Sequence, residues 1–418
     1  MKLALLPVLI CIILTVSGSL PAQTYDLNLE NVNNRFPDLS GVAHILQDSR
    51  GFMWFGSGYG LMKFDGYEVT VYKHEPEDST SLSSSSITAI VEDEQMTLWI
   101  GTINGLNRLN PVNGSCRRYN HNPDNPSSIS NNYITALYID NSGVLWIGTQ
   151  EGGLNKTVID QQNTRDSLYF YCYQYDSANA SSLSNNYVRF IIEDTLADKS
   201  VLWIGTANGL NLFDKTTCTF TRYFHDPNEP NSLINNDLYS VYRDKQGDLW
   251  LGASEGWLSR LHKTKTGALQ FSHHRLGANL KIYSITADKD DNLWLSTNFH
   301  GLYHFNTNSY RTTHHNSYFS GFKYTDLKSV STTFIDNAGT LWIGTWPYLY
   351  KNDPHRRPFD FVPVSPPPRV WSMDVLTFYE DKEGILWVGT GGRGILKYDL
   401  YRNQFYNFAP DSITNRCL

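Results

Sequence analysis

The chain is 418 residues long, with 18% charged residues and a formal net charge of −7. Binding to nucleic acid or to an anionic membrane surface needs a stripe of basic residues, so this charge argues against both partners. Aromatic residues make up 14% of the chain, which is typical of a β-rich protein.

The first 22 residues have the layout of a secretory signal peptide. Lys2 precedes an apolar run from Leu3 to Val16, and small residues lead to Ala22. The run is shorter than the ~20 residues that a membrane-spanning helix needs. We therefore predict a signal peptide over 1–22 and a periplasmic location for the mature chain, and leave the cleavage position open.

One short phrase recurs through the rest of the chain. It reads Thr-Leu-Trp-Ile-Gly-Thr at 340–345, and its eight copies place tryptophans at Trp54, Trp99, Trp146, Trp203, Trp250, Trp294, Trp342 and Trp387. Successive tryptophans are 44 to 57 residues apart, and one apolar strand per period of this length is typical of a β-propeller blade. The sequence predicts an all-β fold, a β-propeller of four-stranded antiparallel blades.

The second repeat shows how each repeat divides into strands. We predict strands at 87–92, 98–102, 106–109 and 116–119, separated by turns that contain Gly, Asn, Asp and Pro. The second strand is apolar on both faces, so its tryptophan is predicted to fill the wedge between neighbouring blades. In seven repeats an aspartate stands six residues before the tryptophan, and in the fourth repeat Asp194 stands nine before it. We expect these carboxylates to cap turn amides.

A second phrase joins the last strand of one repeat to the next repeat. It is clearest at 121–132 and 225–236, where His, Pro, Ser and Asn surround one apolar residue, Ile129 or Leu233. Polar turn formers around a single apolar residue predict an ordered loop that is pinned into a groove. The recurring His121 and His225 are interpreted as structural capping residues.

Residues 351–372 contain six prolines and lack the loop phrase, which indicates a boundary between two propellers. We predict a seven-bladed propeller over 23–362, with the stretch 25–29 adding an outer strand to its last blade. Residues 363–418 are then a proline-rich linker and the first blade of a second, truncated propeller. A single eight-bladed ring is the alternative.

The cysteines predict neither a disulfide framework nor a metal site. Cys116, Cys172 and Cys218 fall late in three successive repeats, and Cys417 lies in the tail. Equivalent outer strands of neighbouring blades lie well apart, and no Cys-x-x-Cys spacing occurs. We expect unpaired thiols and no cofactor.

Two phrases that recur in register carry a family resemblance. The Asp-x-x-Gly-x-Leu-Trp-Ile-Gly-Thr phrase of 140–154 and the loop phrase of 121–132 together resemble two-component regulator propeller repeats, over about residues 25–410. That resemblance implies the periplasmic sensor region of a Bacteroidetes-type hybrid two-component system. Ser296 in place of glycine, Ala253 in place of threonine and Trp346-Pro347-Tyr348 in place of the usual turn depart from the pattern.

Members of that family usually carry a second propeller, a β-sandwich, a membrane helix and then kinase, receiver and DNA-binding modules. The resemblance therefore implies downstream propeller, β-sandwich and kinase modules as partners in the full-length protein, together with homodimerisation and attachment to the inner membrane. No kinase glycine motif or phosphorylatable histidine box is found here, so this fragment is predicted not to be an enzyme. The family typically responds to oligosaccharides.

The aspartate turn also resembles the Asp box of sialidase-like propellers, which are enzymes. A glycosidase would need a separated pair of carboxylates at the mouth of the ring, and acids with suitable sequence positions are Glu151, Glu255, Asp237 and Asp374. Solvated loop acids are the simpler interpretation. A carbohydrate-active enzyme, glycosidase or lyase, and a protein-interaction scaffold remain the alternatives to an oligosaccharide sensor.

Candidate ligand-binding residues are those that differ from their counterparts in other repeats at one mouth of the ring. They are Tyr133, Tyr187, Arg189, Tyr239, Lys281 and Tyr283 at the starts of first strands, and His300 and Trp346 in the turns after second strands. Aromatic faces and cations suit sugar stacking and hydrogen bonding, and would also suit a protein interface. We expect Tyr187, Arg189, Tyr239 and Lys281 to form one patch, and an alanine at 189 to weaken binding with little change in melting temperature.

Overall fold

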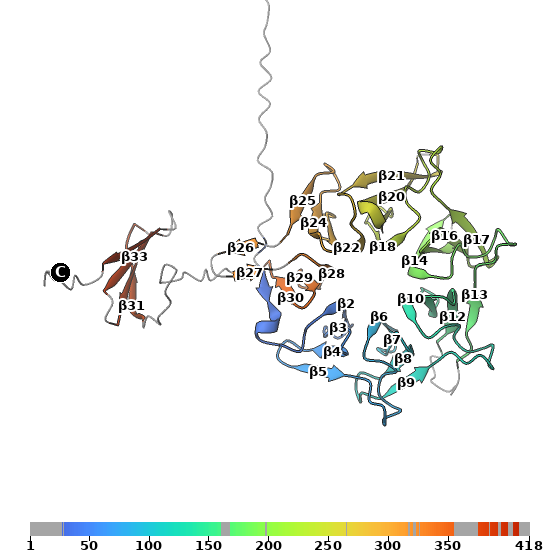
Figure 1. Cartoon of the computed structure of the whole chain (residues 1–418), viewed down its shortest axis with the longest axis horizontal. Helices are drawn as coiled ribbons and strands as arrows, with labels where there is room; N and C mark the ends of the chain where they lie inside the picture. The colour runs from blue at the N-terminus through green and yellow to red at the C-terminus, as the bar shows by residue number, and fades with distance from the viewer. Residues whose placement is uncertain are drawn as a thin grey trace, which may run out of the picture. The chain divides into compact units, whose positions relative to one another are not determined.

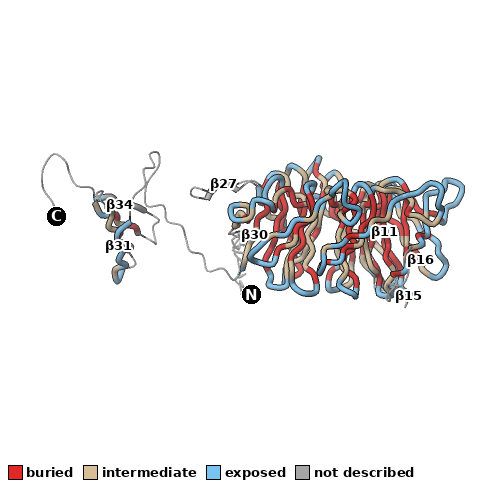
Figure 2. The backbone as a smooth tube through the Cα atoms, turned by 90° about the horizontal axis from the view of Figure 1, so that it is seen from below, coloured by how far each residue is buried: buried red, intermediate tan, exposed pale blue. Residues whose placement is uncertain are grey.

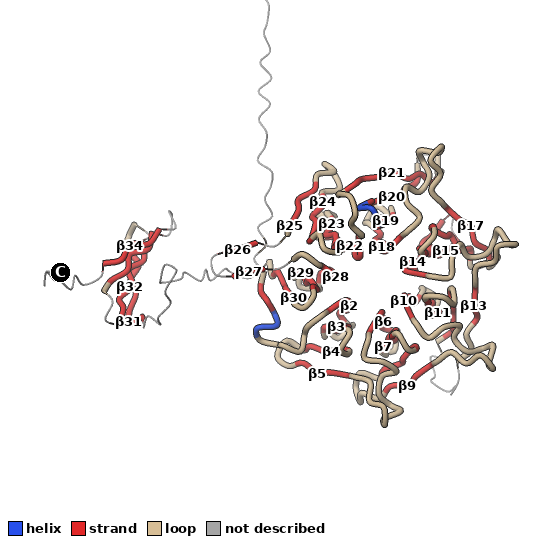
Figure 3. The backbone as a smooth tube through the Cα atoms, viewed as in Figure 1, coloured by secondary structure: helices blue, strands red, loops and turns tan. Residues whose placement is uncertain are grey.

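The computed structural model describes residues 27, 29–159, 168–196, 199–264, 266–316, 318–320, 323–325, 327–354, 375–383, 385–391, 394–399 and 404–408. These residues form strands and two 3-10 helices, η1 (Val32–Asn34) and η2 (Ser254–Gly256), as Figure 3 shows. None of them belongs to a helix long and apolar enough to cross a membrane. The predicted all-β fold is confirmed. The predicted signal peptide lies outside the described residues.

Six four-stranded antiparallel sheets are each built from one stretch of chain. The first three comprise β2 (Val42–Gln47), β3 (Met53–Ser57), β4 (Leu61–Phe64), β5 (Val69–Tyr72); β6 (Ile87–Glu92), β7 (Leu98–Thr102), β8 (Gly105–Leu109), β9 (Cys116–Tyr119); and β10 (Ile134–Ile139), β11 (Val144–Thr149), β12 (Leu154–Val158), β13 (Tyr171–Tyr173). The next three comprise β14 (Val188–Leu196), β15 (Lys199–Thr206), β16 (Gly209–Asp214), β17 (Thr219–Tyr223); β18 (Leu238–Arg243), β19 (Leu249–Ala253), β20 (Trp257–Lys263), β21 (Leu269–Arg275); and β22 (Ile282–Ala287), β23 (Leu293–Thr297), β24 (Gly301–Phe305), β25 (Thr312–His315).

The seventh sheet combines both ends of this part of the chain. Its strands are β28 (Val330–Ile335), β29 (Leu341–Thr345), β30 (Leu349–Asn352) and, outermost, β1 (Glu30–Asn31). The prediction of an N-terminal outer strand is right in kind but wrong in position, because β1 pairs Glu30 with Lys351 and begins after residue 29. Leu27 and Leu29 are instead buried in the core of this sheet, and the rest of 25–28 lies outside the described residues.

The seven sheets contact one another in cyclic order through their first strands. β2, β6, β10, β14, β18 and β22 contact their successors, β22 contacts β28, and β28 contacts β2. Figure 1 shows the sheets arranged around a common axis. Figure 2 shows buried residues along the strands and exposed residues in the turns at both edges. Apolar second strands therefore form the core between neighbouring sheets, as the repeat pattern predicts.

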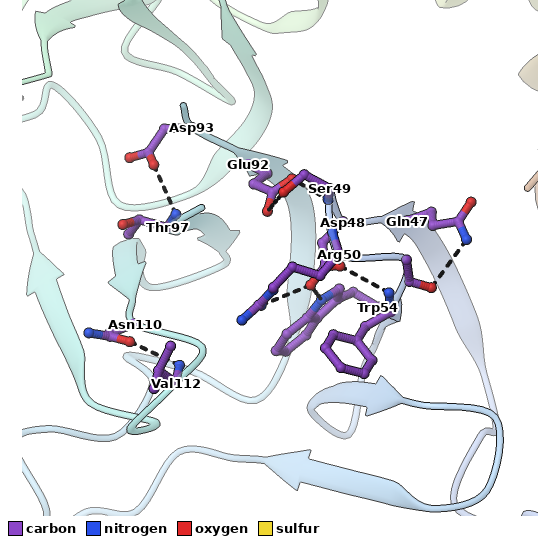
Figure 4. Close-up of polar contacts among 12 residues, drawn as sticks. Gln47, Asp48, Ser49, Arg50, Trp54, Glu92, Asp93, Thr97, Asn110 and Val112 are labelled. Carbon is purple, nitrogen blue, oxygen red and sulfur yellow. Dashed lines mark hydrogen bonds and ion pairs between the residues drawn. The ribbon is translucent and has the colours of Figure 1, made fainter. Parts of the chain in front are cut away.

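In seven of the repeats an aspartate fixes the tryptophan of the second strand. Asp48 accepts hydrogen bonds through Oδ1 from the amides of Arg50 and Phe52, at 3.0 and 2.9 Å, and through Oδ2 from Trp54 Nε1 at 2.9 Å (Figure 4). The predicted capping of turn amides is confirmed, and the indole bond is an addition that the spacing alone does not reveal. Equivalent indole bonds of 2.8 to 3.2 Å join Asp93 to Trp99, Asp140 to Trp146, Asp194 to Trp203, Asp244 to Trp250, Asp336 to Trp342 and Asp381 to Trp387.

The inter-repeat loops are pinned as predicted. Their apolar residues Leu82, Ile129, Leu183 and Leu233 are at most 1% exposed. His121 Nδ1 donates to the carbonyl of Ile129 at 2.8 Å, and His225 Nδ1 donates to that of Leu233 at 2.9 Å. These histidines are structural, as interpreted from the sequence. Cys116, Cys172 and Cys218 are free thiols.

One ionic contact links the third and fourth sheets. Lys215, in the turn between β16 and β17, donates from Nζ to Asp140 Oδ2 at 2.6 Å and to Glu193 Oε1 at 2.5 Å. The side chains of Lys215, Asp140 and Glu193 are 17%, 1% and 6% exposed. The contact therefore bridges two carboxylates that would otherwise be buried without a cation.

The chain divides into two compact units, 1–319 with 324–355 and 320–323 with 356–418. The second unit contains an eighth four-stranded sheet of β31 (Val375–Glu380), β32 (Ile385–Thr390), β33 (Ile395–Asp399) and β34 (Gln404–Phe408). β26 (Tyr318–Ser320) and β27 (Lys323–Thr325) form a separate pair. Most of the proline-rich boundary, including the predicted division at 362, lies outside the described residues and stays a prediction.

Candidate ligand-binding face

One edge of the ring carries both the starts of first strands and the ends of second strands. The register pairs Val188 with Thr206, Leu238 with Ala253 and Ile282 with Thr297. The turns after the second strands and the loops that enter the first strands therefore lie along the same edge, which we call the mouth edge. This arrangement agrees with the sequence-based expectation that residues from these two places meet.

Each first strand has a β-bulge at the mouth edge. In the fourth, fifth and sixth sheets the register shifts between Val188 and Phe190, Leu238 and Ser240, and Ile282 and Ser284. The residues at these shifts are Arg189, Tyr239 and Tyr283. A bulge leaves one residue outside the regular ladder and changes the direction of its side chain, which is why bulges are common beside functional sites.

The same position carries a small residue in the other four sheets of the ring. It is occupied by Ala43, Thr88, Thr135 and Ser331. Three consecutive sheets thus place large side chains where the repeat otherwise has small ones. The large side chains at this position therefore lie on one side of the mouth edge, in the fourth, fifth and sixth sheets.

Six residues of these three sheets form a connected group, the mouth cluster: Tyr187, Arg189, Asp237, Tyr239, Lys281 and Tyr283. Arg189 Nη2 lies 2.9 Å from Asp237 Oδ1. The guanidinium carbon of Arg189 lies 3.8 Å from the ring centre of Tyr239 and 4.8 Å from that of Tyr187. Arg189 therefore links the fourth sheet to the fifth by one ion pair and one cation–π contact, and makes its second cation–π contact within its own repeat.

Lys281 and Tyr283 extend the cluster to the sixth sheet. Lys281 Nζ lies 4.9 Å from the ring centre of Tyr239, and the rings of Tyr239 and Tyr283 meet edge to face at 5.6 Å. The Tyr239 hydroxyl donates to Asp237 Oδ2 at 3.0 Å. Hydrogen bonding with Tyr239 raises the pKa of Lys281, so this amine is charged at neutral pH. The predicted patch of Tyr187, Arg189, Tyr239 and Lys281 is therefore present, while a ligand role for it stays a prediction.

The structure does not bring the remaining candidates into the mouth cluster. Trp346, 58% exposed, stacks on Tyr59, 54% exposed, with ring centres 5.8 Å apart. A Cβ on Gly41 would lie 2.6 Å from the indole, so only glycine lets Trp346 lie this close to the chain there. His300 Nδ1 bonds the carbonyl of Asn298 within its own turn. Tyr133 is 37% exposed at the start of β10 in the third sheet.

The acids suggested for catalysis lie in different settings. Asp237 is bonded to Arg189 and Tyr239. Glu151 and Glu255 are exposed in separate turns, and Asp374 lies outside the described residues. The described part of the chain likewise contains no group of three or more His, Cys, Asp or Glu residues that could hold a metal ion.

The repeats match a known family. The model for "Two component regulator propeller" matches residues 81–104, 128–151, 232–255, 276–299 and 370–392. Five segments of this chain therefore match the two component regulator propeller family. A short segment is also 50% identical over 44 residues to "Histidine kinase P4" of Formosa agariphila, which covers 10% of this chain and 3% of that protein.

Solved structures share the fold of this chain. The extracellular domain described as that of a hybrid two component system, BT3049 of B. thetaiotaomicron, is 23% identical with a TM-score of 0.60, covering 88% of this chain and 52% of that chain. The corresponding domain of BT4673 is 20% identical with a TM-score of 0.58, covering 93% and 48%. The chain thus spans about half the length of these extracellular domains and resembles them in fold.

Proposed function

We propose that this regulator propeller is the extracytoplasmic ligand-sensing part of a hybrid two-component sensor and that it binds an oligosaccharide at the mouth cluster. The observation that carries the proposal is the convergence of large polar and aromatic residues from three consecutive bulges. A residue that only builds the repeat would recur around the ring. These residues instead interrupt the repeat on one side of the mouth edge.

The chemistry of the cluster suits a saccharide. Aromatic faces such as that of Tyr283, 40% exposed, stack on the apolar face of a pyranose ring, and charged groups bind its polar substituents. Binding would be transmitted through downstream propeller, β-sandwich and kinase modules, in a homodimer attached to the inner membrane. A periplasmic location, after removal of residues 1–22, belongs to the same proposal.

The test is calorimetric titration of the full 418-residue chain against a panel of plant and host oligosaccharides. Arg189→Ala should weaken binding by about 1–3 kcal/mol, the range for a hydrogen bond to a charged group. The side chain of Arg189 is only 14% exposed and is ion-paired, so we now expect this variant to lose some stability as well. Melting curves must therefore accompany each titration.

Arg243→Ala is the matched control. Arg243 ends β18, at the edge opposite the mouth, and pairs with Asp194 at 2.8 Å. The Arg243→Ala change removes an arginine and an ion pair but leaves the mouth cluster intact, so saccharide binding should persist. Equal binding by the Arg189 variant and the parent would remove the proposed site. Release of new reducing ends by the parent would favour the carbohydrate-active enzyme instead.

A further inference from the structure

We propose that the saccharide recognised at the mouth cluster is anionic, and that its carboxylate or sulfate group replaces Asp237 as the partner of Arg189. This inference rests on the proposed function and specifies its ligand class. It also gives Asp237 a defined role, as the internal anion that occupies the site when no ligand is bound.

The first argument is the charge of the cluster. Arg189 and Lys281 are both cations, and Asp237 is the only carboxylate among the six cluster residues. Within the described residues, Arg189 and Asp237 form an ion pair, whereas Lys281 contacts the Tyr239 ring and forms no ion pair. The cluster is therefore net positive in a chain with a formal charge of −7. A local positive site of this kind attracts anions.

The second argument is the incomplete use of the Arg189 guanidinium. A guanidinium carries five N–H donors in a planar fork that matches a carboxylate in a bidentate way. Nη2 lies 2.9 Å from Asp237 Oδ1, and Nε is buried with no hydrogen-bond partner among the described residues. The rings of Tyr187 and Tyr239 lie against this guanidinium. The guanidinium is thus held in place and has a donor without a partner.

The third argument is that Asp237 is the more accessible member of the pair. The Asp237 side chain is 34% exposed, whereas that of Arg189 is 14% exposed. Asp237 can rotate toward water after losing its contacts with Arg189 and Tyr239. A charge-assisted hydrogen bond is about twice as strong as a neutral one, so a hydroxyl of a neutral sugar would not displace this carboxylate. An acidic substituent would compete on equal terms and would also face Lys281.

The experiment uses the full chain and pairs of saccharides that differ in charge. The probes are tetragalacturonate with its fully methyl-esterified form, sialyllactose with lactose, and a heparan sulfate tetrasaccharide with its desulfated form. Affinities are measured by calorimetry for the parent, Asp237→Asn and Glu151→Gln. The last variant removes an exposed mouth-edge acid outside the cluster, so it controls for the change in net charge.

We expect at least one acidic probe to bind at least tenfold more tightly than its neutral partner. Asp237→Asn should tighten that binding by about five- to tenfold, because it removes the competing carboxylate. Glu151→Gln should change it less than twofold. If Asp237→Asn does not fold, Lys281→Met is the second variant, because it leaves the Arg189–Asp237 pair in place. It should weaken the binding of acidic probes by about tenfold and leave the binding of neutral probes unchanged.

Each contrary outcome points to a different error. Equal or tighter binding of the neutral partners would overturn the anionic ligand class while leaving the sensor proposal standing. Weaker acidic binding by Asp237→Asn would overturn the replacement of Asp237. Binding to none of the six probes by the parent would count against both the inference and the proposed oligosaccharide site.

Discussion

Lys215→Met should destabilise the ring more than any ordinary lysine substitution. The change removes the cation that Asp140 and Glu193 share and keeps most of the aliphatic volume. Removing one partner of a buried ion pair typically costs 3–5 kcal/mol. Asp140 keeps its bond from Trp146, and Glu193 keeps its bond from the Asn141 amide, so we expect a value near the lower end, about 3 kcal/mol.

The pH dependence of this loss follows from the two carboxylates. Burial alone would raise the pKa of Asp140 and of Glu193, but hydrogen bonds, with Lys215 foremost, outweigh it and lower both from their ordinary values of 3.8 and 4.5. A lowered folded-state pKa stabilises the protein above the unfolded-state value, and this stabilisation is lost as pH falls through the folded-state value. The difference between parent and Lys215→Met should therefore be full at pH 7 and shrink below pH ~4.

Urea denaturation of the full chain at pH 7 and at pH 3.5, followed by tryptophan fluorescence, measures this difference. Lys199→Met is the matched control, because Lys199 is 61% exposed and lies 3.8 Å from Asp214. An exposed pair of that kind contributes at most about 1 kcal/mol. The reasoning fails if Lys215→Met and Lys199→Met unfold at the same urea concentration, or if their difference grows on acidification.

Three further outcomes are expected. Trp146→Ala should lower the free energy of unfolding by about 3–5 kcal/mol, because the indole is 2% exposed and bonded to Asp140. A urea midpoint equal to the parent's would contradict the role of this tryptophan in filling the wedge between blades. Leu233→Ala should lower the free energy of unfolding by about 2–5 kcal/mol. Val112→Ala, at an 84% exposed position, should change it by no more than about 0.5 kcal/mol. Equal losses of stability would refute pinning of the loop by Leu233. Burial raises the pKa of Cys116 to about 12, so mass spectrometry after iodoacetamide treatment at pH 8 should find Cys116 unmodified until urea unfolds the chain, and rapid native labelling would contradict its burial.

The sequence predicts features that recur in several or all repeats and involve near neighbours in the chain. The second-strand tryptophans, the aspartate caps and the loop anchors such as Leu233 are of this kind. Each depends on a short and nearly constant spacing, so the copies reinforce one interpretation. The mouth patch was predictable for the complementary reason, since Arg189 and Tyr239 break the pattern at equivalent positions.

Contacts between residues that lie far apart in the sequence leave no periodic signal. Lys215 reaches Asp140 of the preceding sheet, and nothing in its own turn marks it as different from an exposed lysine. The pairing of Trp346 with Tyr59 joins the seventh sheet to the first, and its geometry depends on the close approach to Gly41. The start of β1 was misplaced because Leu27 and Leu29 alternate like a strand, yet their side chains are used for core packing.

The mixed origin of the seventh sheet sets an order of events during folding. Six sheets are each built from one stretch of chain, but β1 has no partner until β30 is present, because Glu30 pairs with Lys351. Until then Val42 and Phe55 lack the covering indole of Trp342, with which they share a core. A chain that lacks this part therefore presents an apolar flank that favours aggregation or chaperone binding. The seventh sheet covers this flank once its strands are in place.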